Sequence, residues 1–184
     1  MLEATKELDR LNRQIASCRE CQLGQMRSNA VPGEGPADAT IMFIGEAPGF
    51  HEDRQGRPFV GAAGKFLDQL LASIGLDRSD VFIANVIKCR PPQNRNPTTD
   101  EIHSCQPFLE RQIQVIRPKV LVGLGLFACQ WLLKTAEPMG RLRGRLGEYE
   151  GITVMSTYHP AYLLRSPSAK KHVWKDMKVV RSLL

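Results

Sequence analysis

Residues 40–59 read TIMFIGEAPGFHEDRQGRPF, and this stretch decides how the rest of the chain is interpreted. The apolar run 41–44 ends at Gly45 and is followed at once by the carboxylate of Glu46. A buried strand that ends in carboxylates on a glycine- and proline-rich loop is typical of an open α/β sheet, which binds its ligand outside the carboxyl ends of its strands. The stretch therefore predicts the first strand of such a sheet and one wall of a ligand pocket.

The remaining chain alternates between strand and helix patterns. Apolar residues at helical spacing predict helices over 3–17, 61–74, 98–116, 126–134 and from 168 onward. Short runs rich in β-branched residues predict strands over 40–45, 81–87, 120–124 and 152–156, and residues 137–151 indicate a hairpin or an exposed basic loop. This alternation predicts one α/β domain over residues 1–184, with a three-layer α/β/α arrangement and a four-stranded, mainly parallel sheet.

Polar side chains follow three of the four predicted strands. Because the carboxyl ends of parallel strands meet at one edge of the sheet, residues far apart in sequence are expected to converge there. These residues are Glu46, Glu52, Phe59, Asn85 and His159. The sequence therefore predicts a single pocket built from three loops.

The positive charge is concentrated in the last quarter of the chain. Residues 1–137 hold 16 basic and 16 acidic side chains, whereas residues 138–184 hold 9 basic side chains against Glu148, Glu150 and Asp176. This excess favours an anionic partner such as nucleic acid, although a solvated basic helix explains the charge count equally well.

The first residues lack an apolar leader segment and no apolar run is long enough to cross a bilayer, so we expect a cytoplasmic protein without a membrane partner.

Four of the five cysteines are candidates for one metal site. Cys18 and Cys21 have the C-x2-C spacing of metal-binding knuckles, and Cys89 and Cys105 supply a second, more widely spaced pair. Four thiolates can bind zinc or an iron–sulfur cluster, and the asymmetric second pair favours the cluster only modestly. In the alternative interpretation, Cys89 and Cys105 are ordinary residues. Cys129 lies in an apolar run and is expected in the core.

Several motifs together resemble the family 4 uracil-DNA glycosylases of bacteria and archaea. They are GEAPG at 45–49, GRPFVG at 56–61, Asn85 before KCRPP, NRNP at 94–97, HPAYLLR at 159–165 and the four cysteines. The resemblance covers nearly the whole chain. It implies a monofunctional enzyme of base excision repair, which flips uracil out of DNA and hydrolyses its N-glycosidic bond to leave an abasic site. It also implies a [4Fe-4S] cluster on Cys18, Cys21, Cys89 and Cys105.

The resemblance also implies a uracil pocket. In this pocket Gly45, Glu46 and Ala47 line the walls, Phe59 stacks on the base, Asn85 reads the pyrimidine edge and His159 faces O2. One departure stands out, because Phe50 and His51 separate the Pro-Gly turn from the acidic pair 52–53.

The chemistry of the reaction assigns further roles. The uracil anion that leaves needs a hydrogen-bond donor, which His159 can supply, while Glu46, Glu52 and Asn94 are candidates to hold the attacking water. Glu52 is also our first choice for the wall that excludes the methyl group of thymine.

An enzyme that flips a base needs an apolar wedge and a contact with the DNA backbone, for which we expect Leu163, Leu164 and Arg165. We expect the enzyme to be a monomer that acts on uracil-containing DNA. Two other interpretations are compatible with the sequence. One is a metal-stabilised nucleic-acid-binding module without catalysis, and the other is an electron-transfer protein that uses a cluster.

Overall fold

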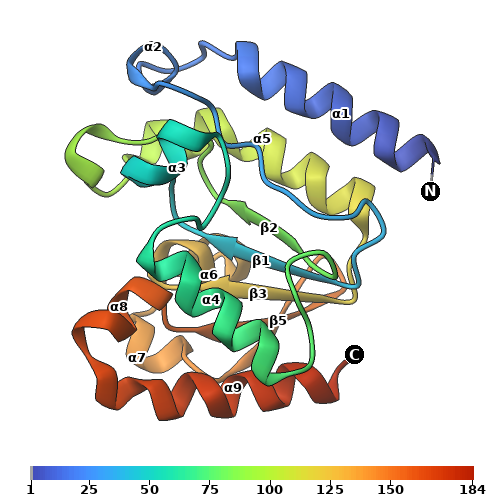
Figure 1. Ribbon diagram of the computed structural model, residues 1–184, viewed down its shortest axis with the longest axis vertical. Helices are drawn as coiled ribbons and strands as arrows, with labels where there is room; N and C mark the ends of the chain where they lie inside the picture. Colours follow the sequence, from blue (N-terminus) through green and yellow to red (C-terminus); the bar gives the residue numbers. More distant parts are fainter. Residues whose placement is uncertain (1) are drawn as a thin grey trace.

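The structure is a computed structural model that describes residues 2–184, and its centre is one five-stranded sheet (Figure 1). The strands are β1 (Ile41–Gly45), β2 (Phe82–Asn85), β3 (Val120–Leu124), β4 (Leu146–Tyr149) and β5 (Ile152–Thr157). They lie in the order β2-β1-β3-β5-β4. The β1–β2, β1–β3 and β3–β5 pairs are parallel.

The fifth strand corrects the expected count of four. β4 pairs with β5 antiparallel at the end of the sheet, so only the second half of the predicted hairpin region 137–151 takes part in a hairpin, and its partner is the strand predicted after it. Its two-residue turn, Glu150 and Gly151, has φ values of 48° and 83°. Two consecutive residues with positive φ are typical of the type I′ turn, whose twist matches that of antiparallel strands. The sequence did not distinguish a hairpin from an exposed loop here, because only every second residue of such a strand has to be apolar.

Helices cover both faces of the sheet, which confirms the predicted three-layer α/β/α class (Figure 1). One face packs against α5 and α6, with α1 lying against α5, and the other face packs against α4 and α9. The helices are α1 (Leu2–Ser17), α2 (Leu23–Met26), α3 (Phe50–Gln55), α4 (Ala62–Ser73), α5 (Thr99–Ile116), α6 (Leu126–Leu133), α7 (Met139–Leu142), α8 (Pro160–Arg165) and α9 (Lys170–Ser182). None of the helices in residues 2–184 is long and apolar enough to span a membrane.

Strand β1 shows why both faces must be covered. Met42 and Ile44 point into the core beneath α1 and α5, whereas Ile41 and Phe43 point into the core beneath α4 and α9. All four side chains are fully buried. Burial of each such side chain stabilises the fold by about 1.5–3 kcal/mol, so a continuous apolar run in a central strand requires a helical layer on each side.

The parallel strands end together at one edge of the sheet, as predicted. Gly45 lies opposite Asn85, and Leu124 lies opposite Thr157. The Gly125 backbone N–H then donates to the Thr157 carbonyl at 2.9 Å, which joins the loops after β3 and β5. The segments that follow β1, β2 and β5 therefore start at the same edge of the sheet.

Helix α3 was not predicted, because residues 50–55 were interpreted as part of a loop. Gly49 precedes the helix without a side-chain cap, and Gly56 ends it with φ 69°. Its stability comes from a distant segment instead: the buried carboxylate of Asp53 accepts from the backbone N–H groups of Ser28 and Asn29 at 3.0 and 3.4 Å. A six-residue helix without an apolar stripe leaves no periodic signal in the sequence.

Candidate active site

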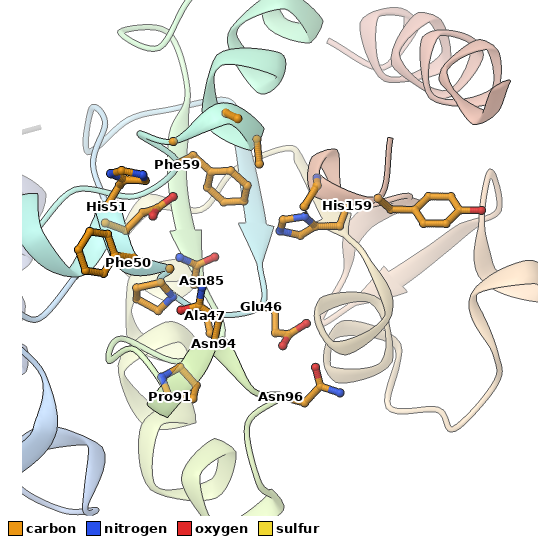
Figure 2. A pocket seen from close by; sticks show the side chains of 18 of the residues that line it. Glu46, Ala47, Phe50, His51, Phe59, Asn85, Pro91, Asn94, Asn96 and His159 are labelled. Atoms are coloured by element: carbon orange, nitrogen blue, oxygen red, sulfur yellow. Dashed lines mark hydrogen bonds between the residues drawn. The ribbon is translucent and has the colours of Figure 1, made fainter. Parts of the chain in front are cut away.

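A cavity of about 590 Å³ lies where the strand-end loops meet (Figure 2). Eight of the site residues named from the sequence line it, namely Glu46, Ala47, Glu52, Phe59, Asn85, Asn94, His159 and Arg165. Gly45, Leu163 and Leu164 do not line this cavity. The predicted convergence of three loops is therefore observed, and the cavity is the candidate active site.

Phe59 lies in a conformation that the surrounding structure has to hold in place. Its φ of 52° is uncommon for a residue with a bulky side chain, and such strain is concentrated at functional sites. The Arg78 guanidinium donates to the carbonyls of Pro58 and Phe59 at 2.6 and 3.0 Å, and Glu34 in turn binds Arg78. The Phe59 ring is thereby fixed beside His159, with 5.5 Å between ring centroids and 28° between ring planes.

His159 is arranged as a neutral hydrogen-bond donor. Its Nδ1 accepts from the Ala161 backbone N–H at 3.0 Å, so the neutral ring carries its proton on Nε2. Burial, with a smaller contribution from the positive charge of Arg165, lowers the pKa of His159 to about 4. At neutral pH the pocket therefore contains an uncharged imidazole whose Nε2–H is free to donate.

This protonation behaviour predicts a pH effect on stability. The folded-state pKa of His159 is about 4, whereas an unfolded histidine titrates at about 6.5. Between these values the unfolded chain binds more protons, so His159 makes the free energy of unfolding fall as the pH falls through this window. We expect chemical denaturation from pH 7 to pH 4 to give a shallower fall for His159→Ala than for wild type, and equal slopes would contradict the assigned pKa.

Asn85 presents a buried acceptor without a partner. Its side chain is only 2% exposed, and within residues 2–184 its Oδ1 has no hydrogen-bond partner. Such an atom costs about 1–3 kcal/mol unless a ligand supplies a donor. Because Asn85 also lines the cavity, its side-chain carbonyl is available to accept a hydrogen bond from a ligand N–H.

Gly45 leaves the space that this arrangement requires. A Cβ at this position would lie 2.5 Å from Asn85 Oδ1 and 2.6 Å from Phe59 Cζ. Neither neighbour can retreat easily, since Asn85 is buried and Arg78 holds the backbone at Phe59. Gly45 thus shapes the pocket without lining it.

We expect Gly45→Ala to lower the activity of this site about 100-fold, because misplacing reacting groups by roughly 1 Å has an effect of that size. The matched control is Gly140→Ala, since a Cβ at Gly140 would meet nothing within 4 Å. Steady-state kinetics and melting curves of both variants test this. Wild-type activity in Gly45→Ala would show that the close packing around Gly45 is unimportant.

The three candidates for holding water come from three different segments. Glu46 follows β1 and is partly buried, and burial raises the pKa of its carboxyl group above the ordinary range. Glu52 lies in the first turn of α3. Asn94 ends an exposed 3-10 turn (Pro92–Asn94), and its Oδ1 accepts from Arg90 Nε at 2.6 Å.

Helix α8 changes the expectation for the wedge. Leu163 is fully buried in the core between α4 and α9, so its side chain has no surface to offer a partner. Leu164 is 46% exposed, and Arg165 lies at the rim of the cavity. The burial of Leu163 follows from helical geometry, because the inward face of a short amphipathic helix must meet the core.

The four cysteines expected to bind a metal surround a second, smaller cavity. Cys18, Cys21, Cys89 and Cys105 all line it. Within residues 2–184 no three ligating side chains are already gathered around one point where a single metal ion could sit. Burial raises the pKa of Cys105 to about 11 and also raises the pKa of Cys89, so these thiols stay protonated unless a metal displaces their protons.

Two cations adjoin these thiols, and sequence reasoning had not assigned them a role. Arg27 donates to Cys89 Sγ at 2.9 Å and to the Cys18 carbonyl at 3.1 Å. Lys88 is fully buried and donates from Nζ to the backbone carbonyl of Asn85 at 2.9 Å. Positive charge beside four thiols suits a group whose thiolate ligands carry negative charge, so the donor set fits a thiolate-bound metal or cluster.

Sequence reasoning also missed Arg78, which binds the carbonyl of Phe59. No local pattern marks a residue that acts across 19 positions of sequence.

Comparisons with known proteins agree with this geometry. The profile of the uracil DNA glycosylase superfamily matches residues 32–178. The type-4 uracil-DNA glycosylase of Sulfurisphaera tokodaii is 46% identical, over 96% of this chain and 84% of its own length. That of Archaeoglobus fulgidus is 45% identical, over 97% of this chain and 94% of its own. A type-5 uracil-DNA glycosylase of Pyrobaculum aerophilum is 33% identical, over 72% of this chain and 66% of its own. The chain therefore belongs to the uracil DNA glycosylase superfamily and, within it, to the type-4 enzymes.

Proposed function

We propose that the chain is a monofunctional uracil-DNA glycosylase, which releases uracil from DNA by hydrolysing the N-glycosidic bond. The observation that carries this is the side-chain carbonyl of Asn85, which has no hydrogen-bond partner within residues 2–184 and lies at a cavity beside the stacked rings of Phe59 and His159. The names of the relatives support the same substrate. The product is an abasic site, which places the enzyme in base excision repair.

Recognition of uracil is assigned to Asn85 and Phe59. The Asn85 carbonyl accepts from N3–H of the base, while the amide of the same side chain donates to O4. Cytosine has the opposite pattern, with an acceptor at N3 and a donor at N4, so it leaves both groups of Asn85 unsatisfied. Phe59 provides the face on which the base stacks, Glu46 and Ala47 border it, and Gly45 leaves the space that Asn85 and Phe59 occupy. Thymine differs from uracil only by a methyl group, and we assign its exclusion to Glu52.

Catalysis is assigned to His159 and to the polar groups around it. As the glycosidic bond breaks, negative charge develops on uracil, and Nε2–H of His159 stabilises it by donating to O2. The sugar becomes cationic and is attacked by water. Glu46, Glu52 and Asn94 line the cavity and are the groups to which we assign the orientation of this water.

We assign DNA binding to α8 and to the basic C-terminal quarter of the chain. Leu164 is the exposed apolar side chain that enters the space left by the flipped nucleotide, and Arg165 holds the adjacent phosphate. The excess of 9 basic over 3 acidic side chains in residues 138–184 adds affinity that does not depend on base sequence. This affinity is therefore expected to fall as the salt concentration rises.

A [4Fe-4S] cluster bound by Cys18, Cys21, Cys89 and Cys105 is part of the proposal. The four thiols line one cavity, the Arg27 guanidinium donates to Cys89 Sγ, and the backbone N–H of Lys88 donates to Cys105 Sγ. Bound by four thiolates, the cluster has a structural function. It joins the end of α1 to the loop that carries Asn94.

The domain organisation, oligomeric state and location of the protein are also assigned. We assign residues 1–184 to one uracil-DNA glycosylase domain that acts as a monomer in the cytoplasm. In support, both faces of the sheet are already covered by the chain's own helices. Sedimentation velocity in the presence and absence of a uracil-containing oligonucleotide tests the monomer.

The decisive experiment is cleavage of a labelled oligonucleotide that contains one uracil. Purified protein is expected to create an alkali-labile site at the uracil, with no strand break before alkali treatment. Matched oligonucleotides with cytosine or thymine at that position are expected to stay intact. Binding of the uracil oligonucleotide without any alkali-labile site would refute the enzyme and favour a non-catalytic nucleic-acid-binding module.

A further inference from the structure

Helix α3 places an aromatic ring in solvent beside the pocket. Phe50 is 47% exposed and lines the cavity together with His51. Figure 2 shows Phe50 and His51 on the side of the cavity opposite His159. Neither side chain is used by the recognition or catalysis described above, and an exposed phenylalanine at the rim of a binding site suggests a contact with the ligand.

Two arginines lie against this ring. The guanidinium carbon of Arg54 is 5.6 Å from the ring centroid of Phe50, and that of Arg90 is 5.2 Å from it. Arg54 belongs to α3, whereas Arg90 belongs to the loop after β2, so two separate segments bring positive charge to the same place. In the described part of the chain, residues 2–184, neither guanidinium forms an ion pair with a carboxylate.

This combination matches the chemistry of single-stranded nucleic acid. An exposed aromatic ring stacks on a base, and guanidinium groups without a carboxylate partner bind the phosphates on either side. The arginines do not simply shield the ring, because Phe50 keeps almost half of its surface exposed beside them. A small molecule or a protein partner would not call for both features at the rim of a pocket that already holds a nucleobase.

The position at the rim identifies which nucleotide is bound. When one base occupies the cavity between Asn85 and Phe59, the strand must enter and leave across the rim, and the neighbouring base has lost its stacking partner. We propose that Phe50, Arg54 and Arg90 form a subsite that stacks the base next to the flipped uracil and binds its phosphate. This inference rests on the proposed function and adds a second DNA-binding surface, on the side of the cavity opposite His159.

The test uses two single-stranded oligonucleotides that each contain one uracil. In the first, the uracil has ordinary neighbours; in the second, abasic nucleotides replace the neighbours on both sides. Phe50→Ala is expected to lower kcat/KM about tenfold on the first oligonucleotide, the size of effect typical of one lost base–aromatic stack. On the second oligonucleotide, Phe50→Ala and wild type are expected to have equal kcat/KM.

Three further variants sharpen this test. Phe50→Trp keeps a stacking surface and is expected to match wild type on the first oligonucleotide. Arg54→Ala is expected to reduce the salt dependence of binding, because it removes one phosphate contact. Leu146→Ala is the matched control, since Leu146 is 51% exposed but does not line the cavity, and it is expected to match wild type on both oligonucleotides.

The results separate this inference from the proposed function. If wild-type protein releases uracil but Phe50→Ala loses nothing, or loses equally on both oligonucleotides, the stacking subsite is wrong and the glycosylase stands. If wild-type protein releases no uracil from either oligonucleotide, the proposed function itself fails.

Discussion

Replacing His159 with alanine is expected to slow uracil release about 100- to 1000-fold while leaving affinity for uracil-containing DNA within a few-fold. The expectation follows from the arrangement of the ring: Nδ1 is occupied by the Ala161 N–H, and Nε2–H is left for the substrate. A donor aimed at charge that develops only in the transition state contributes about 3–4 kcal/mol to the rate and little to ground-state binding.

Single-turnover kinetics give the rate of the chemical step directly, and fluorescence anisotropy gives the affinity. The matched control is His103→Ala, because His103 is an exposed histidine on α5 that does not line the cavity. A loss of rate accompanied by an equal loss of affinity and a lower melting temperature would show that His159 only supports the fold. An unchanged rate would remove His159 from the mechanism.

The elements with regular chemistry were predictable from sequence. The Thr98 and Glu101 side chains both form the capping bonds that the pattern TTDE indicates, so the start of α5 was located correctly. The buried run of β1 was likewise correct, because an apolar strand between two helical layers leaves a continuous signal. The second strand was predicted to reach residue 87 but ends at Asn85. Beyond it the backbone still bonds to the neighbouring segment, since Val86 N–H donates to the Gly45 carbonyl at 2.9 Å.

The parts of the site that were missed depend on contacts between distant residues. Nothing near Asp53 in the sequence indicates that it holds α3 by binding the backbone at Ser28. The strained φ of Phe59 is likewise a consequence of Arg78, which approaches from another segment. The exposed Leu164 and the buried Leu163 are equally apolar in sequence, and only the packing of α8 distinguishes them. Sequence thus indicates which residue types gather at the edge of the sheet, and tertiary contacts decide how each is aimed.

Replacing Cys89 with serine is expected to remove the visible absorbance at about 400 nm that the wild-type protein should show as a thiolate-bound iron–sulfur protein. Loss of a metal site is among the few changes that lower the free energy of unfolding by more than about 4 kcal/mol, so most of this variant is expected to be insoluble. The control is Cys129→Ala, because Cys129 is a fully buried thiol outside the four-cysteine cavity. It should keep both iron and colour.

Loss of the cluster is also expected to disturb the uracil pocket, because two chains of contacts connect the four thiols to this pocket. Arg27 binds Cys89 Sγ, and the next residue, Ser28, donates to Asp53, which holds α3 and Glu52. Lys88 donates to the Cys105 thiol through its backbone N–H at 3.2 Å and to the backbone carbonyl of Asn85 through Nζ. Any soluble Cys89→Ser protein is therefore expected to release uracil more slowly as well as to lack iron. Metal analysis identifies the cofactor independently of activity, and zinc in a colourless wild-type protein would contradict the proposed cluster. Full uracil release by iron-free Cys89→Ser would show that the thiols do not affect the uracil pocket.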